Sequence, residues 1–393
     1  MNIRNHVPPG KARKRVIVTL TTLLGAFCIT AVSAGARAGE SHVTAPSNGV
    51  AIAEANIQRA EQAPTFVAPP SFDVAKAKGK TVWWLDSDAG NILVSWFDAG
   101  KTALASVGVK VHAYDIGDGT PDTVNTALKL AVAGKAAAIV IGIGTPASEY
   151  SAGIDAAHAA GIPVFTAVNS IPGVPPKVPG VTADNTFDYE GAARLEADWI
   201  VAATKGKADV LTINYTGVSA SQFMVPAFNA ELKRLCPSCK NTVKTVSASI
   251  SDLNSAFGSL TSTALLSDPH INWINPLYDS FVIYVQPALD SLQRSSSVGL
   301  LGFNGIAPLM STLKKGGTSL QIDIGQPNEW LGYAIADNVL RALTGNPVIT
   351  NLHIGNRIFT HASVQSLNVT SENDQTWYGL NLAQDYAKVW QQQ

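Results

Sequence analysis

Short apolar runs alternate with amphipathic stretches over much of the chain. Apolar residues at Ile92, Leu93, Trp96 and Phe97 follow the helical period. Apolar runs predict strands on either side of such stretches, at 81–85, 109–114, 137–143 and 162–168. This alternation predicts a parallel sheet with helices on both faces and right-handed connections.

A second series of the same kind follows a break. The break, Ser170 to Gly180, holds four prolines. Beyond it, strands are predicted at 208–214, 242–247, 271–275, 298–303 and 319–324, with amphipathic stretches between them. The predicted fold class is therefore α/β, with two doubly wound parallel-sheet lobes.

The N-terminus has the pattern of a secretory signal peptide at 1–38. The basic cluster Lys11 to Arg15 precedes the apolar run Val16 to Val32 and the small-residue exit Ala36-Arg37-Ala38. A retained membrane anchor is one alternative, although the run is at the short limit for a span. A lipoprotein is another, but Phe27 stands before Cys28 where a small residue is needed. We expect a periplasmic or extracellular protein.

Two flanking segments fall outside the strand and helix series. Residues 39–79 are rich in Ala, Pro and Ser. We interpret them as a leader segment that wraps the outside of the fold, with a short helix from Ala53 to Gln62. Residues 366–393 form a C-terminal tail that we expect on the outside.

Composition narrows the class of protein. With 393 residues, 46% of them hydrophobic, the chain can bury two cores. The formal net charge of −1 gives no basic face, so no nucleic acid partner is expected. We also expect a monomer.

Cys236 and Cys239 remain after export, spaced Cys-Pro-Ser-Cys. In an oxidising compartment this spacing favours a local structural disulfide. A redox-active dithiol is the alternative, but the pair follows a predicted helix and precedes a strand, whereas such a site follows a strand at a helix start.

Four short motifs carry a family resemblance. They are Ala159-Ala160-Gly161-Ile162-Pro163-Val164, Val181-Thr182-Ala183-Asp184-Asn185, Gly302-Phe303-Asn304-Gly305 and Gly325-Gln326-Pro327. In this order, over about Lys80 to Phe359, they resemble the type 1 periplasmic binding proteins, which include the ribose- and galactose-binding proteins of ABC transporters.

The resemblance implies two lobes joined by three crossovers, with a ligand cleft between them. Lobe 1 would comprise 80–183 and 326–353, and lobe 2 would comprise 184–325 and 354–365. A ligand would favour the closed form, which a membrane permease would then recognise.

The positions that bind sugars in the family differ here. Val168 and Asn169 stand in place of an Asp-Arg pair, Gln222 or Met224 in place of an Arg, and Asn304 in place of the Asp of GFDG. Buried hydroxyls without partners cost roughly 1–3 kcal/mol each, so a cleft this poor in charge favours an aromatic, terpenoid or steroid-like ligand.

The expected ligand-binding residues come from these positions, from Tyr278 and Asp279, which stand where the family has an Asn after a strand of lobe 2, and from the loop after the first strand. For Asp88 a helix cap is an equal alternative. The full set is Asp86, Ser87, Asp88, Asn91, Asn169, Gln222, Met224, Tyr278, Asp279 and Asn304. No catalytic residues, cofactor or metal site is expected, because no histidine lies at a strand end beside a nucleophile.

The sequence therefore predicts an exported protein that captures a small organic solute and delivers it to an ABC permease. Three alternatives stay open. One is a sensor that presents its closed form to a membrane receptor, another is a binder of a simple sugar or polyol, and the third is a secreted enzyme on the same fold.

Overall fold

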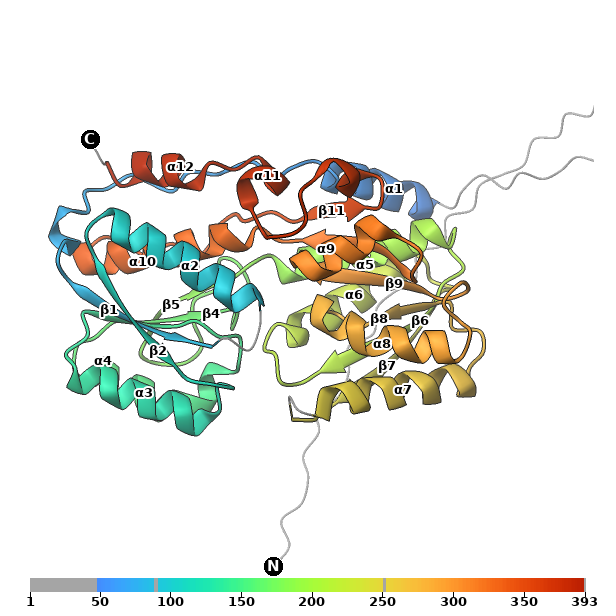
Figure 1. Ribbon diagram of the computed structural model, residues 1–393, viewed down its shortest axis with the longest axis horizontal. Helices are drawn as coiled ribbons and strands as arrows, with labels where there is room; N and C mark the ends of the chain where they lie inside the picture. Colours follow the sequence, from blue (N-terminus) through green and yellow to red (C-terminus); the bar gives the residue numbers. More distant parts are fainter. Residues whose placement is uncertain (1–47, 88–90, 250–251, 392–393) are drawn as a thin grey trace, which may run out of the picture. The chain divides into compact units, whose positions relative to one another are not determined.

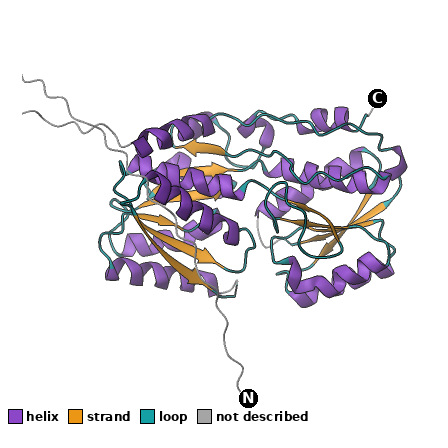
Figure 2. Cartoon of the chain, turned by 180° about the vertical axis from the view of Figure 1, so that it is seen from behind, coloured by secondary structure: helices purple, strands orange, loops and turns teal. Residues whose placement is uncertain are grey.

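Two sheets with helices on both faces make up the described part of the chain (Figures 1 and 2). The computed structural model describes residues 48–87, 91–249 and 252–391, and residues 46–393 form one compact unit. The predicted signal peptide at 1–38 lies outside the described residues. Among the helices described, none is long and apolar enough to cross a membrane.

The first sheet is wholly parallel and defines lobe 1. Its order is β2 (Lys110–Asp115), β1 (Thr81–Asp86), β3 (Ala138–Ile141), β4 (Val164–Ala167) and β5 (Val181–Asn185). Every residue of β3 and β4 is buried, because helices cover both faces. Those helices are α2 (Asn91–Ser106) and α10 (Asn328–Thr344) on one face and α3 (Pro121–Ala133) and α4 (Ser151–Ala159) on the other (Figure 1).

The second sheet defines lobe 2 and has the same order with one strand added. It runs β11 (Arg357–Thr360), β10 (Leu320–Gly325), β9 (Gly299–Asn304), β8 (Trp273–Asn275), β6 (Asp209–Tyr215) and β7 (Lys240–Val246). β11 alone among these strands is antiparallel to its neighbour. The helices are α5 (Tyr189–Ala203), α6 (Ser221–Leu235), α7 (Leu253–Ser267), α8 (Asp279–Ser291) and α9 (Ala307–Lys315). The predicted fold class is confirmed.

The chain passes between the two sheets three times, as expected. It leaves lobe 1 after β5, returns between β10 and α10, and leaves again between α10 and β11. The predicted lobe boundary between 183 and 184 falls inside β5, which pairs with β4.

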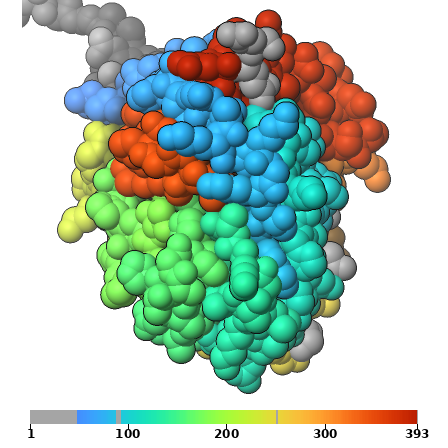
Figure 3. All heavy atoms as spheres, turned by 90° about the vertical axis from the view of Figure 1, so that its left-hand side faces the viewer, coloured from blue at the N-terminus to red at the C-terminus, as the bar shows by residue number. Residues whose placement is uncertain are grey.

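The leader and the tail both span the two lobes. Helix α1 (Asn48–Ala60), which begins before the expected Ala53, packs on α5 and α6 of lobe 2, and the chain then runs to β1 of lobe 1. We call residues 366–391 the C-terminal strap; it contains α11 (Asp374–Tyr378) and α12 (Leu382–Val389). Figure 3 shows the blue leader and the red strap gathered at the top of the molecule.

The strap is anchored by buried side chains. Trp377 and Trp390 are 1% and 2% exposed, and Trp390 Nε1 donates to Asp337 Oδ1 of α10 at 2.8 Å. On lobe 2, Lys314 Nζ of α9 donates to the Leu367 carbonyl oxygen at 2.7 Å. The tail, which the sequence placed on the outside of the fold, is therefore held against both lobes by buried side chains and hydrogen bonds.

The predicted disulfide is present. Cys236 and Cys239 are bonded and link the end of α6 to the start of β7, a place that suits a structural bond.

Candidate ligand-binding cleft

A cavity of about 260 Å³ lies between the two lobes, at the carboxyl ends of their strands. Doubly wound sheets bind ligands at this edge. Lobe 1 contributes Ser87, Leu93, Trp96, Asp118, Gly119, Ile143, Gly144, Thr145 and Val168. Lobe 2 contributes Tyr189, Tyr215, Gly217, Val218, Leu253, Tyr278, Ser280, Phe281, Tyr284 and Asn304.

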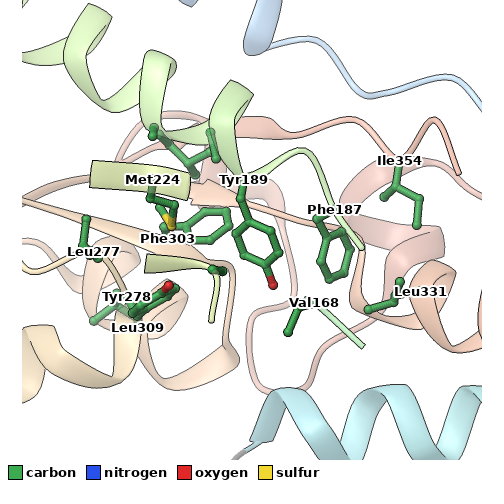
Figure 4. Packing of buried hydrophobic residues seen from close by; sticks show 14 of the residues in the cluster. Val168, Phe187, Tyr189, Met224, Leu277, Tyr278, Phe303, Leu309, Leu331 and Ile354 are labelled. Carbon is green, nitrogen blue, oxygen red and sulfur yellow. The ribbon is translucent and has the colours of Figure 1, made fainter. Parts of the chain in front are cut away.

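Aromatic rings form much of the wall. Tyr278 and Phe281 meet edge to face at 5.6 Å between ring centroids, and Tyr215 meets Phe281 in the same way at 5.3 Å. Figure 4 shows Tyr189 between Phe303 and Phe187, with its hydroxyl on the side of Val168. Among the described lining residues, Asp118 is the one that carries a charge. The wall therefore suits apolar and aromatic ligand surface.

Two buried tyrosine hydroxyls lie at the cavity, and burial moves their pKa further above the ordinary value. Desolvation raises the pKa of Tyr189 and Tyr278, and the Tyr278 hydroxyl lies 3.1 Å from Ser221 Oγ. Both hydroxyls therefore keep their protons at neutral pH and can donate hydrogen bonds.

Backbone strain gathers at the strand ends around the cavity. Val168, Leu277 and Asn304 follow or end β4, β8 and β9 with φ of 56°, 70° and 135°. Non-glycine residues adopt such angles at a cost of about 1–3 kcal/mol, and they cluster at functional sites. This strain supports placing the ligand site here.

A buried carboxylate fixes the strained loop of lobe 1. Asp184 accepts hydrogen bonds from the Thr166 and Ser170 hydroxyls at 2.6 and 2.7 Å and from the backbone N–H groups of Asn169 and Ser170. Burial still raises the pKa of Asp184 because desolvation outweighs these bonds. The loop after β4 is thus held from beneath by the neighbouring strand.

Two hydrogen bonds cross from lobe 2 to lobe 1 beside the cavity. The Ser219 N–H donates to the Gly144 carbonyl oxygen at 3.1 Å, and Ser219 Oγ donates to Asn169 Oδ1 at 3.1 Å. Both contacts would break if the lobes moved apart.

Three of the residues expected from the sequence line the cavity: Ser87, Tyr278 and Asn304. Ser87 Oγ also donates to the Gly117 carbonyl oxygen at 2.5 Å. Asp86, the last residue of β1, is not among the lining residues. Asp88 lies outside the described residues, and Asn91 begins α2 without a described side chain.

The structure places the other expected residues away from the cavity wall. Asn169 uses its amide within the protein: Oδ1 accepts from the Ala147 N–H and Nδ2 donates to the Ala167 carbonyl oxygen, each at 2.8 Å. Gln222 is exposed, and Met224 is fully buried in the lobe 2 core (Figure 4). Asp279 is fully buried and accepts from the Ile306 N–H.

Sequence reasoning missed several lining residues. Asp118 follows β2, and the rule that ligands bind at strand carboxyl ends would have found it. Tyr189 starts α5 just after the first crossover, and Phe281 and Tyr284 lie in α8 beyond the predicted Tyr278. No sequence signal separates these aromatic residues from ordinary core residues.

A larger hollow of about 590 Å³ lies elsewhere, between α2, α10 and the strap. Glu372 lies there, and Ser95 Oγ and Asn328 Nδ2 donate to it. Burial raises the pKa of Glu372 despite these bonds. The hollow is not at the strand ends, so we place the ligand site in the smaller cavity.

Two doubly wound lobes around a cleft at their strand ends define a two-lobed binding protein. The chain belongs to the periplasmic binding protein family, whose domain matches residues 68–347. The predicted family is confirmed. Members of this family are exported, bind small molecules and work with ABC transporter permeases; they are transport proteins and not enzymes.

Solved structures of the same fold resemble this chain at low identity. An ABC sugar transporter subunit from Rhodobacter sphaeroides 2.4.1 is 19% identical, with a TM-score of 0.64, over 72% of this chain and 99% of that chain. A solute-binding protein from Agrobacterium vitis with bound allitol is 20% identical, with a TM-score of 0.64, over 73% and 97%.

A third solved structure extends the range of ligands seen on this fold. It is a Bacillus halodurans C-125 solute-binding protein with bound myo-inositol, 14% identical with a TM-score of 0.62, over 74% of this chain and 97% of that chain. No curated protein sequence matches the chain.

Proposed function

We propose that this chain is exported, captures a small uncharged solute with apolar or aromatic surface in its cleft, and delivers it to an ABC permease. The observation that carries the proposal is the cavity wall. It is built mainly from aromatic and aliphatic side chains of both lobes. Its polar groups are Asp118, Ser87, Thr145, Ser280, Asn304 and the hydroxyls of four tyrosines.

The balance of polar and apolar groups sets the ligand class. A sugar brings many hydroxyls, and each one buried without a partner costs about 1–3 kcal/mol. An apolar ligand gains about 25 cal/mol for each Å² of apolar surface that it buries. A wall with few polar groups therefore favours the second kind of ligand.

Cavity size narrows the class further. A volume of about 260 Å³ lies just below the usual range of about 300–1,000 Å³ for ligand pockets. This size favours a compact aromatic or terpenoid compound over a steroid-like one.

A simple sugar or polyol is the second candidate. The related structures with bound allitol and myo-inositol favour it, and the tyrosine hydroxyls of the cleft can serve as donors. The related proteins named as transporter components support transport rather than sensing, so the sensor role has no observation in its favour.

The remaining parts of the proposal concern the chain as a whole. We propose a cleaved signal peptide at 1–38, a monomer without enzymatic activity, and no nucleic acid partner. The basic, apolar and small-residue pattern of the first 38 residues supports export. N-terminal sequencing of the exported protein should give Gly39, and a start at Met1 would refute cleavage.

A thermal-shift screen of residues 39–393 tests the ligand class. The panel holds sugars, polyols, amino acids, and neutral aromatic, terpenoid and steroid compounds, each beside the corresponding acid. A ligand at 100 times its dissociation constant stabilises the fold by about 2.7 kcal/mol, which raises the melting temperature measurably. A shift with aromatic or terpenoid compounds supports the proposal, whereas a shift with sugars or polyols alone refutes it in favour of the second candidate.

A further inference from the structure

Two buried carboxyl groups hold the loop that carries Asn304. Asp279 Oδ2 accepts from the Ile306 N–H at 3.0 Å, and Asp323 Oδ1 accepts from the Gly305 N–H at 3.1 Å. Both aspartates are fully buried. The two amides that follow Asn304 are thus bound by side chains of α8 and β10 that do not line the cavity.

The other two carboxyl oxygens converge on Gly302. A side chain at Gly302 would collide with Asp279 Oδ1 and lie 3.4 Å from Asp323 Oδ2. Neither oxygen has a hydrogen-bond donor among the described residues. Two fully buried carboxylates that face each other cannot both be ionised at low cost, and one proton between them satisfies both oxygens.

The groups around the pair oppose ionisation. Burial is the main cause that raises the pKa of both aspartates, and the charge of Asp279 raises the pKa of Asp323 further. Glu196 faces the pair from α5, and Glu372 and Tyr378 face it from the strap. All three are acids.

We infer that Asp279 and Asp323 share one proton, and that this protonated pair positions the Asn304–Ile306 loop for the ligand. Its relevance to binding rests on the proposed function, because Asn304 is the member of the loop that lines the cleft. The two aspartates are positioning residues, since neither is among the residues that line the cavity.

The pair makes loop order depend on pH. Opening the loop breaks its bonds to the two carboxyl groups and lets both take the ordinary carboxyl pKa of about 4. The closed loop binds one more proton than the open loop above that pH. The equilibrium constant for closing the loop is therefore largest in acid. It falls by up to about tenfold per pH unit until the pH reaches the raised pKa of the pair.

Hydrogen exchange of the ligand-free chain 39–393 tests the pair. Protection of the peptide that contains Gly305 and Ile306, corrected for the intrinsic exchange rate, should fall at least about tenfold from pH 5 to pH 8. Equal protection at both pH values would overturn the inference. Because no ligand is used, this result does not depend on whether the cleft binds an aromatic compound or a sugar.

An amide at position 323 mimics a protonated Asp323 carboxyl group. In Asp323→Asn the side-chain oxygen can still accept from Gly305, and the NH₂ can donate to Asp279. We expect this variant to keep wild-type protection at pH 5 and to lose the pH dependence. In Asp323→Ala protection should be lower at both pH values. An Asp323→Asn variant that keeps the pH dependence would also overturn the inference.

Asp198→Asn provides a matched control. Asp198 is a buried carboxyl on α5 that accepts from Asn56 Nδ2 of α1 at 3.0 Å, and burial raises its pKa to about 7. This variant should leave the pH response of the 304–306 loop unchanged. Infrared spectra of the wild type and of Asp323→Asn at pH 5 give a further readout, since the protonated-carboxyl band of the pair should be present in the wild type and missing from the variant, while the bands of the other buried acids remain in both.

Discussion

At the scale of single residues, Asn304 both lines the cleft and has a strained backbone conformation. It ends β9 with φ of 135°, is 8% exposed and lines the cleft. Its carbonyl oxygen accepts from Asn328 Nδ2 at 3.3 Å, at the crossover into α10. Its side chain is therefore held at the cavity by its own backbone and by the crossover.

Replacing Asn304 by glycine should separate ligand contact from folding. Glycine tolerates positive φ, so Asn304→Gly keeps the loop and removes the side chain. Loss of one hydrogen bond, about 1–1.5 kcal/mol, should weaken binding of the ligand from the screen about tenfold, as measured by calorimetry. Unchanged affinity would mean that the Asn304 side chain does not contact the ligand.

Met224→Ala is the opposite control for that measurement. Met224 is fully buried in the lobe 2 core, and a Met-to-Ala change in a core costs about 2–5 kcal/mol. This variant should lower the free energy of unfolding and leave ligand affinity in the folded protein unchanged.

At the scale of elements, helix α12 fixes the C-terminal strap to lobe 1 and to the leader. Trp390 packs against Tyr386 and Tyr333 at 5.3 and 6.3 Å between ring centroids. The backbone carbonyl of Val389 accepts from the Phe72 N–H at 2.9 Å, so the strap also holds the leader.

Trp390→Ala should destabilise the protein by about 3–5 kcal/mol, because it leaves a cavity and removes the donor to Asp337. Urea unfolding followed by circular dichroism measures the loss. Lys388→Ala on the same helix is the matched control. Lys388 forms an exposed ion pair with Asp385, and such pairs contribute little. A loss below 1 kcal/mol for Trp390→Ala would show that the strap is not part of the cooperative fold.

At the scale of the whole molecule, buried acids make stability depend on pH. Burial raises the pKa of Glu196 to about 8, so its folded-state pKa lies above its unfolded value. The stability that it contributes is fully present below pH 4 and is lost as pH rises to about 8. Asp184, Asp337 and Asp374 are raised in the same direction, with burial as the largest cause.

The free energy of unfolding should therefore fall by a few kcal/mol between pH 5 and pH 8. Urea unfolding at several pH values measures this. Glu196→Gln keeps an oxygen for Asn275, which donates to Glu196 at 2.7 Å, and should flatten the profile. A profile that rises with pH would contradict the assignment of buried neutral acids.

The fold could be predicted from the sequence because the hydrophobic periodicity and the residues that begin and end helices indicate the same elements. Thr120 caps α3, Pro121 follows at its first position, and Gly134 ends it. The poverty of charge at the cleft was also predicted, and Asp118 is the charged residue among the described lining residues.

Individual contacts could not be predicted, because they depend on side-chain direction. Gln222 and Met224 are two positions apart on α6, so they point to different sides of the helix. One is exposed and the other is in the core. Ser221 instead reaches Tyr278. The contacts of the C-terminal strap could not be predicted because its anchors, Trp377 and Trp390, pack on residues that are distant in sequence.

The leader and the strap have a consequence for the rate at which cargo is released. With the three crossovers between the sheets, they bring to five the segments that span the two lobes. Lobe separation must distort all of them together with the Ser219 contacts. Spontaneous release should therefore be slow, on the timescale of local unfolding from microseconds to seconds. A permease that pulls on one lobe would then shorten the residence time of the solute without weakening its equilibrium affinity for the free protein.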